Sequence, residues 1–72
     1  MESNSNVERV EGIIEETLPN LLFRVTLKDG GQILAYLGGR LKLNRIKVIA
    51  GDRVLIEKPI AEKNRGRIVR RL

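Results

Sequence analysis

The sequence contains no cysteine and no histidine. Disulfide bonds, thiol chemistry and the common zinc sites built from these two residue types are therefore excluded. General acid–base catalysis would have to rely on carboxylates, lysines or the single tyrosine. No glycine-rich loop has the Walker or the dinucleotide-binding spacing. We therefore expect a protein that is not an enzyme and that holds neither a metal ion nor a cofactor.

Long apolar runs are missing as well, so no segment predicts a membrane span. Residues 1–6 read Met-Glu-Ser-Asn-Ser-Asn, with no basic start and no apolar stretch behind it, which is unlike a targeting segment. We expect these six residues to form a disordered tail and residues 7–72 to form a single small domain. A cytoplasmic location without membrane contact is the expectation that follows.

Aromatic residues are limited to Phe23 and Tyr36. Phe23 alternates in phase with Val25, which predicts a place in the core. Tyr36 lies on the strand face opposite Ala35 and is therefore available to stack on a nucleobase. Proteins that bind flexible single strands usually offer several aromatic platforms. A single free aromatic among many basic residues is better suited to a folded RNA, with contacts mainly to phosphate and ribose.

Negative charge is scarce in the second half of the chain. Residues 1–36 carry three basic and six acidic side chains, a net charge of −3, whereas residues 37–72 carry eleven basic and three acidic ones, a net charge of +8. Arginines outnumber lysines nine to five, and the planar guanidinium is suited to phosphate and to stacking on bases. This polarity predicts a polyanionic partner. A solvated surface, a membrane surface or an acidic protein are the alternatives.

Alternation of apolar and polar residues predicts five short strands separated by turn residues. Gly12, inside the first of them, indicates a bulge or a sharp bend. A short helical connector is expected near residues 39–45, between the third and fourth strands. This order predicts an all-β, five-stranded OB-fold barrel, although an SH3-like barrel would also accommodate five strands. The expected strands span residues 7–17, 23–27, 32–37, 53–57 and 66–70.

Most of the remaining glycines have a structural explanation. Gly30, Gly31 and Gly51 follow or form turns, where a positive φ is expected. Gly38 and Gly39 end the third strand, and they either serve a turn in the same way or let the backbone approach a phosphate.

Basic residues cluster in the connector and at the C-terminal end of the chain, and we expect these clusters to bind RNA. We expect Arg9, Lys28, Arg53 and Lys58, in contrast, to be ordinary solvated side chains. The candidate RNA-binding residues are Arg24, Tyr36, Gly38, Gly39, Arg40, Lys42, Arg45, Lys47, Arg65, Arg67 and Arg70.

Several segments resemble bacterial translation initiation factor one. They are residues 11–20 followed by Phe23-Arg24-Val25, then Gly39-Arg40-Leu41-Lys42, Ala50-Gly51-Asp52-Arg53-Val54 and Arg65-Gly66-Arg67-Ile68-Val69. In order and spacing they extend without gaps from Val7 to Arg71. Residues 33–37, Ile-Leu-Ala-Tyr-Leu, resemble plastid members of the family.

The resemblance implies an OB-fold that binds the A site, in the decoding region of the small ribosomal subunit. It implies contacts with ribosomal RNA and a neighbouring ribosomal protein, and joint action with the other two initiation factors to block premature tRNA binding. It further implies a chain that is monomeric when free, in the cytoplasm or the plastid stroma. The basic residues that match the family's pattern are Arg24, Arg40, Lys42, Lys47 and Arg67.

This chain departs from the family's pattern at four places. Ile60-Ala61-Glu62 stands where the family usually has Pro-Tyr-Asp, and Leu43 stands where a basic residue is common. Arg45 and Arg70 each replace a frequent aromatic residue. The last loop and the connector are therefore the parts where details of the family are least expected to carry over.

Overall fold

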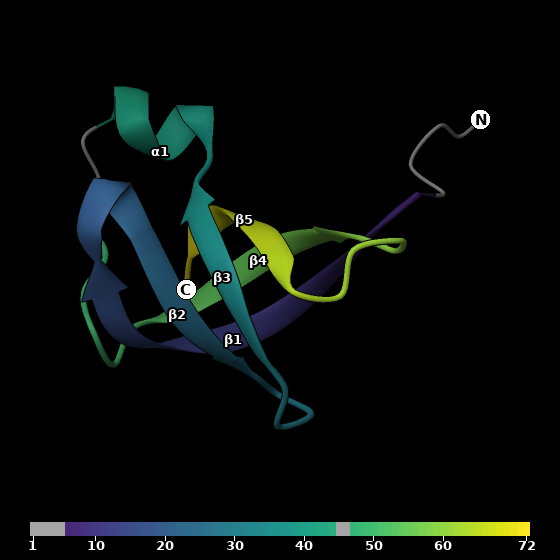
Figure 1. Ribbon diagram of the computed structural model, residues 1–72. Coiled ribbons are helices and arrows are strands. Elements are labelled where there is room, and N and C mark those ends of the chain that lie inside the picture. Colours follow the sequence, from purple (N-terminus) through teal and green to yellow (C-terminus); the bar gives the residue numbers. More distant parts are fainter. Residues whose placement is uncertain (1–5, 45–46) are drawn as a thin grey trace.

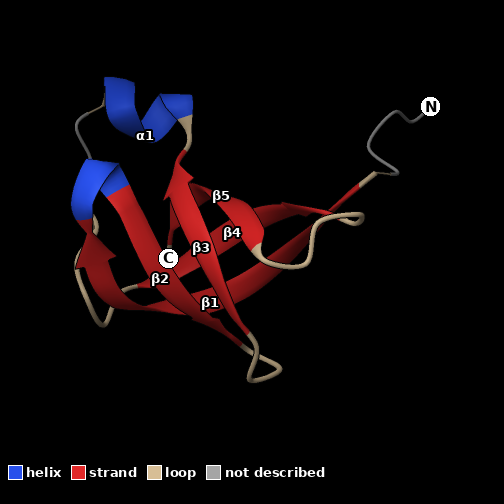
Figure 2. Ribbon diagram, in the orientation of Figure 1, coloured by secondary structure: helices blue, strands red, loops and turns tan. Residues whose placement is uncertain are grey.

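The computed structural model describes residues 6–44 and 47–72. They form five strands, one short α-helix and one 3₁₀ turn, with the helix between the third and fourth strands (Figures 1 and 2). The elements are β1 (Val7–Leu18), η1 (Pro19–Leu21), β2 (Leu22–Leu27), β3 (Gln32–Leu37), α1 (Gly39–Leu43), β4 (Arg53–Pro59) and β5 (Arg65–Arg71).

The strands close into a barrel in the order β1-β2-β3-β5-β4, and β4 pairs again with β1. Within the described part of the chain, only the β3–β5 pair is parallel, and the other four pairs are antiparallel. The long strand β1 makes closure possible because its first half pairs with β4 and its second half with β2. This architecture confirms the predicted five-stranded OB-fold with a helical connector between β3 and β4.

Gly12 lies where β1 passes from one partner strand to the other, since it is paired with both Leu27 and Val54. A Cβ atom at this position would lie 2.6 Å from Val25 Cγ1, closer than packed atoms come. The register of β1 against β2 shifts between Ile14 and Glu16. Gly12 therefore allows close packing where β1 passes from β4 to β2. The bulge or bend that was expected at Gly12 lies instead between Ile14 and Glu16.

Inward-facing residues of all five strands form one apolar core, as their alternation predicts. Phe23 is buried in it as expected. Leu41 of α1 and Val48 of the following segment belong to the same cluster, and α1 contacts β5, so the short helix is packed onto the barrel rather than projecting from it. The buried core residues are Ile14, Phe23, Val25, Leu27, Ile33, Ala35, Leu37, Leu41, Val48, Val54, Ile56 and Ile68.

Two of the three glycines expected at positive φ adopt it: Gly30 has φ of 94° and Gly51 of 95°. The prediction was wrong for Gly31, which is not in the left-handed region. Its N–H instead donates a hydrogen bond of 2.9 Å to Asp29 Oδ1, so the aspartate side chain closes the turn.

The element boundaries differ from the expected ones mainly at β4. β4 continues to Pro59, two residues further than expected, because its partner strand β1 begins early enough for Val7 to pair with Pro59. Five of the six residues expected to form a disordered tail, residues 1–5, lie outside the described residues. Asn6 follows them, and its carbonyl oxygen accepts a hydrogen bond of 2.8 Å from Ile60 N–H. Among the described residues no helix is both long and apolar enough to cross a membrane.

Candidate nucleic-acid interface

A row of four side chains crosses the outer face of strands β3, β5, β4 and β1. Tyr36 is the register partner of Arg67 on the parallel strand β5, Arg67 is paired with Glu57 on β4, and Glu57 with Arg9 on β1. Tyr36 is 47% exposed. The barrel's closure thus brings residues that are up to 58 positions apart into one line across the sheet.

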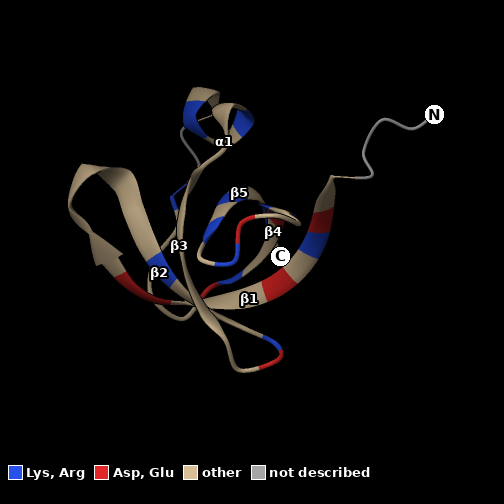
Figure 3. Cartoon of the chain, turned by 45° about the vertical axis from the view of Figure 1, so that its right-hand side comes forward, with Lys and Arg blue, Asp and Glu red and all other residues tan. Residues whose placement is uncertain are grey.

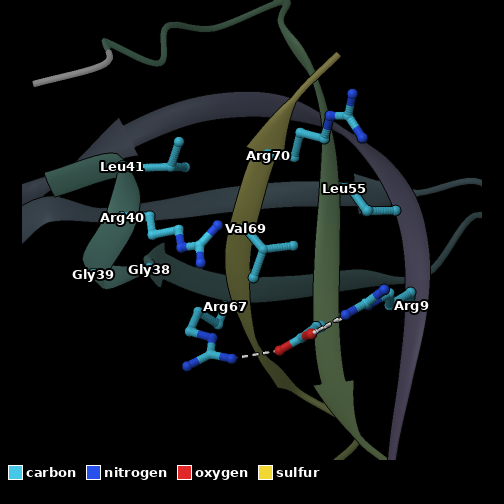
Figure 4. A pocket seen from close by; sticks show the side chains of 10 residues that line it. Arg9, Gly38, Gly39, Arg40, Leu41, Leu55, Arg67, Val69 and Arg70 are labelled. Carbon is cyan, nitrogen blue, oxygen red and sulfur yellow. Dashed lines mark hydrogen bonds and ion pairs between the residues drawn. The ribbon is translucent and has the colours of Figure 1, made fainter. Parts of the chain in front are cut away.

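Glu57 holds the arginines on both sides of it. Arg9 donates from Nε and Nη2 to Glu57 Oε2, at 3.1 and 3.0 Å, and Arg67 donates from Nη2 to Glu57 Oε1 (Figure 4). Only 16% of the Glu57 side chain is exposed. The hydrogen bond from Arg67, followed by that from Arg9, lowers the pKa of Glu57 below the ordinary glutamate value of 4.5. The carboxylate is therefore ionised and bonded through both oxygens at neutral pH.

Two hollows flank this row. The first, which we call the α1 hollow, has a volume of about 530 Å³ and lies between α1, β5, β4 and β1 (Figure 4). Four of its lining side chains are arginines, so the hollow is strongly basic. It is lined by Arg9, Gly38, Gly39, Arg40, Leu41, Leu55, Glu57, Arg67, Val69 and Arg70.

A bulge between β4 and β5 shapes the α1 hollow. Leu55 is paired with Arg70 and Ile56 with Ile68, so Val69 is an extra residue on β5. A bulge of this kind breaks the strict alternation of a strand. Val69 and Arg70, although adjacent in sequence, therefore both line the hollow. Strand alternation alone would have placed them on opposite faces.

The second hollow, the Tyr36 hollow, has a volume of about 410 Å³ and lies on the other side of the Arg67–Glu57 pair. Tyr36 offers an exposed ring at its wall, and Arg65 adds a second cation. Arg67 and Glu57 line both hollows, so this ion pair forms the ridge between them. The lining residues are Val7, Tyr36, Glu57, Pro59, Glu62, Arg65, Gly66 and Arg67.

Gly38, the N-cap of α1, and Gly39, the first residue of α1, have different roles. Gly38 N–H donates a hydrogen bond of 2.8 Å to the carbonyl oxygen of Ile68, and a Cβ on Gly38 would lie 2.9 Å from that oxygen. Gly38 therefore lets β3 pass close to β5. Neither glycine has a positive φ, so the turn interpretation was wrong for both. A Cβ on Gly39 would meet open space, which leaves its backbone accessible from the α1 hollow.

Arg40 and Lys42 lie on α1, and both are exposed. Leu41 between them is buried, which fixes the short helix and directs its basic side chains outward. Figure 3 shows basic residues on α1 and along β5, and Arg40 of α1 lines the α1 hollow together with Arg67 and Arg70 of β5. Part of each predicted basic cluster thus meets at the α1 hollow, although the two clusters are distant in sequence, whereas Lys42 lines neither hollow.

Not every predicted site residue lies at the two hollows. Arg24 forms an ion pair with Glu16 and lines a separate depression that also includes Arg65. Lys47 is exposed outside both hollows, and its carbonyl oxygen accepts a hydrogen bond of 3.0 Å from Arg71 Nη1. Arg45 lies outside the described residues.

Arg9 and Glu57 are the residues that sequence reasoning missed. Arg9 was expected to be a solvated side chain, and 64% of it is exposed, but it also lines the α1 hollow and bonds Glu57. Its position becomes clear only once the register of β1 against β4 is known. Across residues 6–44 and 47–72, no group of three or more acidic side chains is arranged to hold a metal ion.

The model of the family described as translation initiation factor 1A / IF-1 matches residues 2–72, almost the whole chain. The chain belongs to this family. Among solved structures, it is similar to translation initiation factor one from the Wolbachia endosymbiont strain TRS of Brugia malayi, with 37% identity and a TM-score of 0.78. That match covers 99% of this chain and 84% of the Wolbachia protein.

The chain is also similar to a second solved structure. YjeQ from Thermotoga maritima is 30% identical, with a TM-score of 0.75 over 90% of this chain but only 23% of YjeQ. A barrel of this kind therefore also occurs as one part of a larger protein. Membership of the initiation factor family and the Wolbachia relative give this chain a role in translation initiation.

Proposed function

We propose that the chain binds the A site in the decoding region of the small ribosomal subunit, through ribosomal RNA. There it assists the other two initiation factors and blocks premature tRNA binding. It contacts a ribosomal protein near the A site, is monomeric when free, and acts in the cytoplasm or the plastid stroma. It does so by binding alone and catalyses no reaction.

The observation that carries this proposal is the pair of hollows on either side of the Arg67–Glu57 ridge. Arg40, Arg70 and Arg65 surround them, while Tyr36 supplies one exposed aromatic ring. Arginine binds phosphate through two parallel N–H groups, and an aromatic ring stacks on an unpaired base. A surface with many cations and one ring fits a folded RNA with one or two exposed bases better than a long flexible strand.

Binding through phosphates makes the affinity depend steeply on salt, because each neutralised phosphate releases counterions. Affinity alone therefore does not distinguish the decoding region from any other RNA. Specificity must come from the shape of the surface, in which the two hollows lie on either side of a fixed ridge. A generic RNA-binding barrel would bind both ribosomal subunits comparably.

The test is a binding titration of the fluorescently labelled chain with purified small and large ribosomal subunits at two salt concentrations. We expect saturable binding of one chain per small subunit that persists at moderate salt, and only weak, salt-sensitive binding to the large subunit. Equal affinity for both subunits at moderate salt would contradict the proposal.

A further inference from the structure

We propose that Glu57 is an internal competitor for RNA phosphate, which keeps Arg9 and Arg67 from binding phosphates indiscriminately. This inference rests on the proposed function in that it concerns the same RNA-binding surface. It adds a residue of opposite charge whose role is selectivity rather than affinity.

Glu57 offers the two arginines what a phosphate would offer, namely two anionic oxygens at hydrogen-bond distance. One oxygen accepts from Arg67, and the other accepts twice from Arg9. The carboxylate lies at the centre of the surface, on the ridge that separates the α1 hollow from the Tyr36 hollow. An RNA phosphate that approaches Arg67 from either hollow therefore meets a negative charge beside it.

The basic side chains of this face thus fall into two groups. Arg40, Arg65 and Arg70 form no ion pair with any part of the chain that the structure describes. Arg9 and Arg67 are both bonded to Glu57. A single phosphate is fully attracted only by Arg40, Arg65 or Arg70, because Glu57 repels it at the second group. Arg9 and Arg67 remain bonded to Glu57, so a folded RNA that fits the two hollows binds through the first group and places no phosphate on the ridge.

This arrangement lowers the affinity for RNA that cannot fill both hollows, such as a flexible single strand, more than the affinity for a matching folded RNA. Like-charge repulsion of this kind is a common source of specificity at charged interfaces. Glu57 therefore acts as a specificity-determining residue of the RNA-binding surface.

The experiment compares Glu57→Gln with the native chain in binding to a 12-nucleotide oligo(U), measured by fluorescence anisotropy across a salt series. We expect Glu57→Gln to tighten oligo(U) binding about fivefold and to steepen the salt dependence by about one unit of log K per log salt, because released arginines neutralise further phosphates. Small-subunit affinity should rise by a smaller factor than oligo(U) affinity, so that selectivity for the subunit falls.

Two further variants separate competition from a simple change in net charge. Glu62→Gln removes one negative charge from the wall of the Tyr36 hollow, where the Glu62 side chain holds no arginine among the described residues. Glu57→Asp keeps the charge but shortens the side chain, so that it no longer reaches both arginines. We expect Glu57→Asp to tighten oligo(U) binding at least twofold and Glu62→Gln to do so less than twofold. Thermal unfolding checks that all variants are folded.

Equal tightening by Glu57→Gln and Glu62→Gln would overturn the proposal, since charge alone would then explain it. Weaker oligo(U) binding by both Glu57 variants would also overturn it and would make Glu57 a positioning residue for the arginines. The oligo(U) series can be evaluated even if the native chain fails to prefer small subunits. Failure of the proposed function and failure of this inference are therefore distinguishable.

Discussion

Tyr36 and Arg67 are register partners on the parallel strands β3 and β5, and both side chains lie on the outer face of the barrel. The pairing places an exposed aromatic ring beside a guanidinium at the rim of the Tyr36 hollow. When a base stacks on the Tyr36 ring, its own phosphate or a neighbouring phosphate can thus contact an arginine that lines the Tyr36 hollow. The closeness of Tyr36 and Arg67 depends on the pairing of β3 with β5, the only parallel pair among the strands that the structure describes.

Tyr36→Ala should weaken small-subunit binding about tenfold, because stacking of one base on an aromatic ring contributes ~1–3 kcal/mol. Tyr36→Phe keeps the ring and should retain most of the affinity. Ile13→Ala is the matched control, since Ile13 is 46% exposed but lines a different depression, with Glu11 and Lys28. A titration with labelled chain measures all three. An equal loss for Tyr36→Phe and Tyr36→Ala would point to the hydroxyl group rather than to stacking.

Arg40→Ala and Arg70→Ala should each weaken small-subunit binding roughly fivefold and lower the slope of log K against log salt by about one. Both side chains line the α1 hollow, where they are available to phosphate. Arg53→Ala is the control, because Arg53 lies along the depression that contains Ile13. Affinities measured at three salt concentrations give the slopes. A similar loss for Arg53→Ala would mean that net charge, and not position, determines binding.

The ion pairs of Glu57 should make stability depend on pH. Because its pKa is lowered in the folded chain, the native state binds fewer protons than the unfolded state, so the contribution is fully present above pH 4.5 and is lost as pH falls through the folded-state pKa. We expect Glu57→Gln to lower the free energy of unfolding by ~1 kcal/mol at pH 7 and by clearly less at pH 3.

Urea unfolding at the two pH values measures this difference. Glu62→Gln should stay within about 0.5 kcal/mol of the native chain at both pH values, as expected for a surface change that breaks no ion pair among the described residues. A Glu57→Gln deficit that is the same at pH 3 and pH 7 would show that the ion pairs are not its cause.

Gly66 separates the arginines of the Arg65-Gly66-Arg67 segment, and its own role is packing. A Cβ there would lie 2.6 Å from Ile56 Cγ2 and 3.0 Å from Ile33 Cδ1 inside the core. Gly66→Ala should therefore lower the free energy of unfolding by ~1–3 kcal/mol, the usual cost of overpacking. Gly39→Ala, at a position with open space, should leave stability nearly unchanged. Chemical denaturation of both variants is the measurement, and equal stability of the two would contradict this account.

The strands could be predicted from sequence because each has an apolar face of period two. Phe23 with Val25, and Ile33 with Ala35, follow this alternation and all four are buried. The positive φ of Leu21, at 58°, could not be predicted in this way, since a branched aliphatic residue rarely adopts it.

The site was predictable only in part, for a physical reason. Clusters along the sequence indicated Arg40, Arg65 and Arg67, because their charges are dense locally. Arg9 and Glu57 join them through strand pairing between distant segments, and no local pattern reveals such a register. The bulge that directs the side chains of both Val69 and Arg70 to the α1 hollow is likewise a property of the β4–β5 pair and not of either strand alone.

Chemical footprinting of small-subunit RNA, with and without the native chain, tests the central claim most directly. The account predicts that the native chain gives saturable protection, which is confined to the decoding region and persists at moderate salt. The Arg40→Ala variant should give the same protection only at a higher concentration. Diffuse protection that disappears with salt, or protection that the Arg40→Ala variant reproduces at the same concentration, would contradict it.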